Sequence, residues 1–191
     1  DGLLAFGIGD DLSFENEFCD RHPGRVLAFD HIIQTVPYRR PRVDFVPKGV
    51  GPKAAADLVT LDKVVLGGPF ARPMIKMDIE GAEWRVLATC SDRVFERVPI
   101  LVFELHGMLA NTPLQNLVFA RLLEHYEPIH VHANNVGPVL EVDRQLYPEW
   151  LEVTFVHKDL VGDAVDRGSY PTKHDYPNFS ERPDVKLGWW K

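Results

Sequence analysis

The sequence predicts an α/β protein with a doubly wound, mostly parallel, Rossmann-like sheet and an antiparallel strand near the C-terminus. Short apolar runs alternate with amphipathic stretches along the chain, and strands that alternate with helices form right-handed crossovers. A length of 191 residues and a hydrophobic content of 45% fit one globular domain with a sizeable core. We expect a single domain over residues 1–157 and an arm over residues 158–191 that packs on it.

The expected elements follow from these runs. Strands are expected at residues 2–9, 25–30, 42–46, 74–78, 99–105, 128–133 and 150–157, and helices at 13–22, 82–95 and 112–126. Ser13 is expected to cap the first helix and Thr112 the third, with Pro113 at its first position. The arm is rich in Pro, Gly and Ser. We expect its aromatic side chains to be buried, because water solvates them poorly: Tyr170, Tyr176, Phe179, Trp189 and Trp190.

Composition and charge exclude several classes of protein. The net charge is −7, and the densest basic run is the short stretch 38–42, so we expect no nucleic-acid partner. No apolar stretch approaches the roughly 18 residues of a membrane span. Cys19 and Cys90 lie far apart, which favours two free thiols over a disulfide or a zinc cluster and indicates a reducing compartment such as the cytoplasm.

Polar side chains gather where the expected strands end. Ligands of open parallel sheets bind at the carboxyl ends of the strands, so these residues outline a candidate site: Gly7 and Gly9, Asp30 and His31, Asp78 and Glu80, Glu104 and His106, and His132, Asn134 and Asn135. Gly81 separates a strand from a helix, where the backbone is expected to need a positive φ. Glu83 suits the helix dipole, and the two asparagines either form a turn or contact a ligand.

The first crossover indicates an adenosyl ligand. Gly7 and Gly9 allow the backbone to approach a ligand closely, and Asp30 stands where such folds hold the two ribose hydroxyls. Leu12 replaces the third glycine of the G-x-G-x-x-G fingerprint. Asp10 and its neighbour make the turn anionic, which suits the ammonium of an amino acid better than a pyrophosphate. S-adenosylmethionine therefore fits better than NAD, with His31 as a further cofactor contact.

One segment resembles a known family. Residues 75–87, "IKMDIEGAEWRVL", resemble the K-x-D-x-E-G-A-E-x-x-x-L hallmark of FkbM-like methyltransferases. A wider pattern over roughly residues 4–185 is similar to the related methyltransferase-like proteins of animals, through "GIGDDLSFE", "AFD", "ELHG", "HVHANN", "LEVTF" and "DYPNFSERP". The resemblance implies a class I S-adenosylmethionine-dependent fold, with Gly7, Gly9 and Asp30 on the cofactor and Asp78 and Glu80 beside the reacting methyl group. Ala5 and Asp11 depart from the family pattern.

Methyl transfer to a hydroxyl needs alignment and the removal of a proton. His106 is the candidate general base, oriented by Glu104 or Glu80. Asp78, Glu104 and His106 could instead hold a divalent metal, because oxygen and imidazole ligands suit Mg²⁺, Mn²⁺ or Zn²⁺.

The function that we expect is an O-methyltransferase acting on a hydroxyl of a sugar or other small metabolite. Two alternatives stay open. One is an inactive binding or regulatory protein on the same fold, favoured by Ala5 and Asp11. The other is a metal-dependent hydrolase, which the absence of an H-E-x-x-H motif disfavours.

Overall fold

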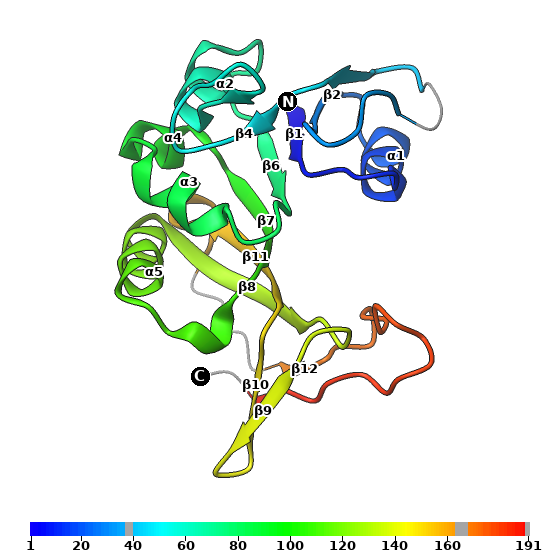
Figure 1. Ribbon diagram of the computed structural model, residues 1–191, viewed down its shortest axis with the longest axis vertical. Coiled ribbons are helices and arrows are strands. Elements are labelled where there is room, and N and C mark those ends of the chain that lie inside the picture. The colour runs from blue at the N-terminus through cyan, green and yellow to red at the C-terminus, as the bar shows by residue number, and fades with distance from the viewer. Residues whose placement is uncertain (37–39, 163–167, 190–191) are drawn as a thin grey trace. The chain divides into compact units, whose positions relative to one another are not determined.

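The computed structural model describes residues 1–36, 40–162 and 168–189. The chain divides into two compact units, residues 1–101 and 102–191 (Figure 1). The division into residues 1–157 and an arm over residues 158–191 stays a prediction. Among the described residues, no helix combines the length and the apolar character needed to cross a membrane. Two residues of the basic run, Tyr38 and Arg39, lie outside the described part of the chain.

Among the described residues of the first unit, four strands of the main sheet run parallel. They lie in the order β3 (Val43–Val46), β2 (Arg25–Phe29), β1 (Gly2–Phe6) and β6 (Met74–Met77). Every residue of β1 is buried, as expected for a central strand covered on both faces. Phe6 is opposite both Phe29 and Met77 in register, so β2, β1 and β6 end level with one another. A short parallel pair, β4 (Gly49–Val50) and β5 (Leu58–Val59), lies outside this sheet.

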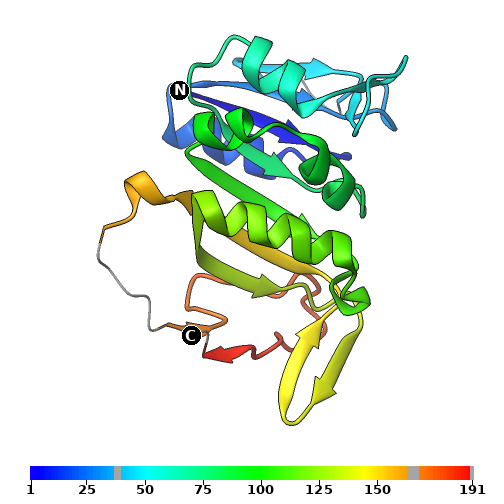
Figure 2. The same cartoon turned by 90° about the vertical axis from the view of Figure 1, so that its left-hand side faces the viewer.

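Helices cover both faces of this parallel sheet. Figures 1 and 2 show α1 (Ser13–Arg21) on one face and α3 (Glu83–Thr89) with α4 (Asp92–Arg97) on the other. The sequence did not indicate α2 (Leu61–Gly67). The expectation of one helix over residues 82–95 is wrong, because the chain turns extended at Cys90, and the next amide, that of Ser91, donates to the Asp62 carboxylate.

The cap expected at Ser13 is also wrong. Leu12 is the N-cap residue of α1 and makes no side-chain cap. The backbone amide of Ser13 instead donates to the Asp11 carboxylate at 2.8 Å, so an acid one residue before the N-cap satisfies one of the free amides at the helix start. Cys19 in α1 and Cys90 after α3 are free and buried, as expected.

The second unit begins within β7 (Ile100–Leu105), which neighbours β11 (Leu151–His157); β11 in turn pairs antiparallel with β8 (Tyr126–Ala133). The expected α/β fold, mostly parallel with an antiparallel strand near the C-terminus, is thereby confirmed. Helix α5 (Pro113–His125) carries the expected Thr112 cap, completed into a capping box by Gln115, and runs beside β8 in Figure 2. The remaining elements are η1 (Met108–Ala110), η2 (Lys158–Leu160), the hairpin β9 (Val139–Val142) and β10 (Gln145–Pro148), and the pair β12 (Ser169–Tyr170) and β13 (Gly188–Trp189).

The segment after residue 168 is tied to β8 through buried groups. Tyr170 is buried, and its hydroxyl donates to the carbonyl of Ile129 at 3.2 Å. Burial of the arm's aromatic side chains is therefore confirmed for Tyr170. It is wrong for Tyr176, which is 79% exposed, and for Phe179 at 40%. The side chain of Trp189, and all of Trp190, lie outside the described residues.

Candidate functional site

The first unit contains a topological switch point. Its chain runs from β1 outward through β2 to β3, and β6 then lies on the other side of β1. In open α/β sheets, the crevice at the carboxyl ends of the strands on either side of such a reversal is the usual place for a ligand. The residues that leave the carboxyl ends of β1, β2 and β6 are therefore the first candidates for a binding site.

The turn that leaves β1 is shaped by two glycines. Gly7 has φ 74° and Gly9 has φ 52°, a region that glycine adopts without a steric penalty. A side-chain carbon added to Gly7 would lie 1.6 Å from the carbonyl oxygen of Asp78, whereas one added to Gly9 would meet nothing within 4 Å. Gly7 is thus required by the close approach of β1 and β6, while Gly9 is required by its backbone conformation and faces open space.

Asp30 follows β2 and fastens this turn. It is 6% exposed, and one carboxylate oxygen accepts the amide of Gly9 at 3.0 Å. The other accepts the amides of Ile32 at 2.7 Å and Ile33 at 3.3 Å. Burial raises the pKa of Asp30, but these three hydrogen bonds, together with a smaller effect of the neighbouring His31, lower the pKa below its ordinary value. A carboxylate has about four acceptor sites, so the ionised Asp30 has about one left for a ligand.

The two remaining cofactor candidates, Asp10 and His31, are exposed. Asp10 stands in the glycine turn. The His31 ring lies against Gly49 of β4, since a side-chain carbon on Gly49 would come within 2.6 Å of His31 Nδ1. His31 thus lies beside β4, one residue after Asp30.

Lys76 places a positive charge at the switch point. Its ammonium donates to the carbonyl of Gly7 at 2.7 Å and lies 3.7 Å from the Asp78 carboxylate. The sequence interpretation missed this role, although the spacing of Lys76 and Asp78 matches the period of two that puts side chains on one face of a strand. Glu15 of α1 is 1% exposed. Burial raises its pKa, and Lys76 opposes that shift more weakly.

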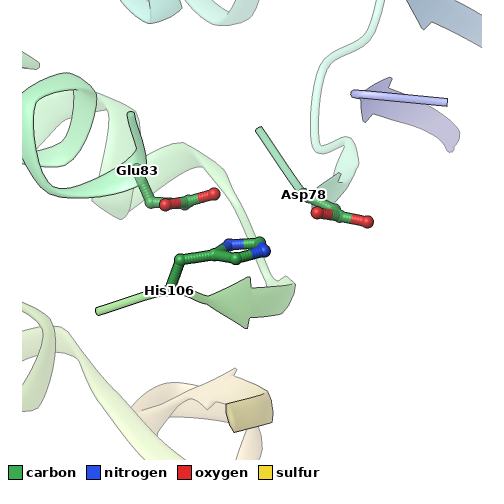
Figure 3. A group of neighbouring side chains, drawn as sticks. All are labelled: Asp78, Glu83 and His106. Carbon is green, nitrogen blue, oxygen red and sulfur yellow. The ribbon is translucent and has the colours of Figure 1, made fainter. Parts of the chain in front are cut away.

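The acids after β6 have separate roles. The turn is left-handed at Glu80, with φ 57°, and at Gly81, with φ 94°, which confirms the positive φ expected at Gly81. Glu83 is fully buried, and one of its carboxylate oxygens accepts the amides of Ile79 at 2.9 Å and Gly81 at 3.2 Å. Glu83 therefore closes the turn as well as suiting the helix dipole. Glu80 is exposed and Asp78 is half-buried. Figure 3 labels Asp78, which directly follows β6, and Glu83, the first residue of α3.

His106 directly follows β7 in the second unit and is also drawn in Figure 3. It is 9% exposed, and its ring centre lies 5.5 Å from that of Trp150. Glu104, one of the residues expected to orient it, accepts a hydrogen bond from the Asn134 amide at 2.7 Å. The role of His106 as a base or a metal ligand stays a prediction.

The two asparagines after β8 hold the chain in place. The side-chain oxygen of Asn134 accepts the amide of Val136 at 2.8 Å, which forms a turn. The side chain of Asn135 accepts the amide of Phe179 at 2.8 Å and donates to the carbonyl of the same residue at 3.0 Å. These bonds favour the structural interpretation over contact with a ligand.

His132, one of the candidates at the strand ends, lies in a buried cluster with two acids that the sequence did not indicate. His132 is 4% exposed and lies between Glu152, 2.9 Å from its Nδ1, and Asp184, 3.1 Å from its Nε2. The pKa of His132 is raised to about 9: the hydrogen bond to Glu152 is the largest cause, the two carboxylate charges and the bond to Asp184 add to it, and burial opposes them. The cluster joins β8, β11 and the C-terminal segment. The spacing of residues 132, 152 and 184 carries no local signal, because only the folded chain brings them together.

No protein-family model matches the chain, and no curated protein matches it in sequence. The resemblance to FkbM-like proteins therefore stays a prediction. Solved structures give weak likenesses. Protein 1320 of Thermoplasma acidophilum has a TM-score of 0.45 at 10% identity, over 82% of this chain and 79% of that one. Precorrin-6y C5,15-methyltransferase of Geobacter metallireducens GS-15 has a TM-score of 0.43 at 16% identity, over 82% and 80%. Likenesses at this level carry no argument about function.

Proposed function

We propose that this chain is an S-adenosylmethionine-dependent methyltransferase whose cofactor binds at the carboxyl ends of β1 and β2. The observation that carries the proposal is the ionised carboxylate of Asp30, bonded to the amide of Gly9 within a glycine turn at the switch point. Its remaining acceptor site suits one ribose hydroxyl, a charge-assisted contact. Gly9 offers the open approach that a ligand needs.

Charge and shape favour a sulfonium amino acid over a dinucleotide. A pyrophosphate is bound by a glycine-rich turn that opens a helix, but here the third glycine position is the buried Leu12. Asp10 and Asp11 are exposed beside the turn and would repel phosphate oxygens. The same acids are favourable neighbours for the ammonium and sulfonium charges of S-adenosylmethionine.

The reaction is an in-line displacement on the methyl carbon. The carbon–sulfur bond breaks with its electron pair left on sulfur, a carbon–oxygen bond forms to the acceptor hydroxyl, and the hydroxyl proton passes to a base. His106 is the proposed base. A small molecule with a hydroxyl group is the proposed acceptor, and the protein mainly contributes alignment.

Calorimetry with S-adenosylhomocysteine tests the cofactor. We expect micromolar binding, about −8 kcal/mol, and no binding of NAD. Asp30→Asn keeps the acceptor oxygen for Ile32, but it loses the charge and puts an NH2 group where an oxygen accepts the Gly9 amide. Affinity should therefore fall by about 1–3 kcal/mol. Asp44→Asn, a change of the same chemistry on the exposed side of β3, is the control and should bind normally. An unfolding curve for Asp30→Asn separates lost affinity from lost structure. Tight NAD binding, or unchanged affinity in folded Asp30→Asn, contradicts the proposal.

A further inference from the structure

A hollow of about 680 Å³ lies in the second unit, between η1 with the residue that follows it and the β9–β10 hairpin. Eight of its ten lining residues are apolar, among them Met108, Leu140, Leu146 and Tyr147, and the two polar ones are Asn111 and Gln145. This volume is within the range of small-molecule sites, which are also mostly apolar with a few polar groups.

The two walls of the hollow are joined at Glu149. Its carbonyl accepts the amide of Met108 at 3.0 Å, and its carboxylate accepts the amide of Leu109 at 3.1 Å. Its own amide donates to the carbonyl of Pro138 at 2.8 Å, just before the hairpin. On the hairpin side, Gln145 donates to the carbonyl of Leu187 at 3.2 Å. Both walls are therefore held by hydrogen bonds within the unit, so the hollow does not depend on a ligand to form it.

The proposed base, His106, contacts the residue next to Glu149. Trp150 follows Glu149 in the chain and packs its ring 5.5 Å from the His106 ring, centre to centre. His106 stands two residues before Met108, which lines the hollow. His106 and the lining of the hollow are therefore connected through two short stretches of chain, residues 106–109 and 148–151.

We propose that this hollow binds the apolar body of the methyl acceptor, which makes the acceptor an alkyl- or aryl-substituted alcohol or phenol and not an unmodified sugar. The proposal rests on the proposed function. A sugar would bring a ring of hydroxyl groups against eight apolar residues, and hydroxyls that lose water without gaining partners are costly to bury. An alkyl or aryl group has no hydrogen bonds to water to lose there. In this proposal the single hydroxyl of the acceptor faces His106.

Binding of a homologous series of 4-alkylphenols tests the hollow without the cofactor. Calorimetry with 4-ethyl-, 4-butyl- and 4-hexylphenol should show affinity rising about threefold to fourfold for each added methylene, as expected when each one leaves water. Methyl glucoside should not bind. Affinity that does not change with chain length, or glucoside binding as tight as that of the phenols, overturns the proposal.

Two matched leucines locate the binding. Leu140 lines the hollow and is 51% exposed, whereas Leu160 in η2 is 52% exposed and does not line it. Leu140→Gln should weaken 4-hexylphenol binding about fivefold to tenfold, and Leu160→Gln should leave it unchanged. Equal affinity in both variants overturns the proposal. So does sedimentation showing a wild-type dimer that Leu140→Gln dissociates, because the hairpin would then be an interface.

The two proposals fail separately. If the phenols bind as expected but S-adenosylhomocysteine does not bind the same preparation, the hollow is a site for an apolar alcohol and the methyltransferase proposal is wrong. If S-adenosylhomocysteine binds while the phenol series shows no dependence on chain length, the cofactor site stands and the acceptor class is wrong.

Discussion

At the scale of single residues, His132 makes the stability of the second unit depend on pH. Its pKa is raised from the ordinary 6.5 to about 9, so the folded state holds a proton that the unfolded chain releases first. The resulting stability is complete below about pH 6.5 and is lost as the pH rises through 9. Each pKa unit corresponds to about 1.4 kcal/mol, so the contribution is of order 3 kcal/mol.

Urea unfolding of the wild type and of His132→Gln at pH 6 and pH 10 measures this. The variant should be less stable at pH 6, because Glu152 and Asp184 lose their buried cation, and the difference should shrink at pH 10. A difference that is the same at both pH values means that His132 is neutral.

The position of Asp30 after β2 could be predicted from the sequence. The three backbone amides that donate to its carboxylate oxygens could not, because only the folded chain brings them there.

At the scale of an element, the turn between β6 and α3 has two adjacent residues with left-handed backbone conformations, and only one of them is a glycine. Gly81 suits its φ of 94°, whereas Glu80 at φ 57° bears the steric cost of a side chain. Gly81→Val should therefore destabilise the protein by about 1–3 kcal/mol, and Glu80→Gly should leave stability unchanged or raise it by up to about 1 kcal/mol. Thermal unfolding of the two variants is the measurement. Equal destabilisation by both would mean that side-chain contacts, and not backbone conformation, set the stability of this turn.

The elements that could be predicted are those with a buried face. Strands β1, β2, β6, β7, β8 and β11 appear as apolar runs, and α5 carries a cap that can be recognised in the sequence. The hairpin β9–β10 was missed because all four residues of β9 are exposed, so no alternation of apolar and polar residues marks it. Its turn has positive φ at Asp143 and Arg144, and that pair lacks the Asn-Gly or Asp-Gly signature of such turns.

At the scale of the whole molecule, each unit has its own candidate residues. The first contains the glycine turn, Asp30 and the acids after β6, and the second contains His106 and the apolar hollow. The polar residues could be located from the sequence because strand ends in an α/β fold are predictable. The hollow could not, because its walls come from a 3₁₀ turn and an exposed hairpin, neither of which has a periodic pattern.

His106 has two proposed roles, a general base or a metal ligand, and they predict different effects of EDTA. As a general base, His106 needs no metal ion, so activity on an alkylphenol should be unaffected by EDTA. His106→Gln should then lower kcat by about 10²- to 10⁴-fold, with unchanged affinity for S-adenosylhomocysteine.

As a metal ligand, His106 would share the ion with Asp78 and Glu104, so activity would be lost in EDTA and restored by one divalent ion. Glu104→Ala is less informative, because Glu104 also accepts the Asn134 amide and its loss disturbs that turn in either case. We expect the result for a base. Recovery of activity on adding metal after EDTA contradicts it, and full activity of His106→Gln leaves alignment of the two substrates as the whole of catalysis.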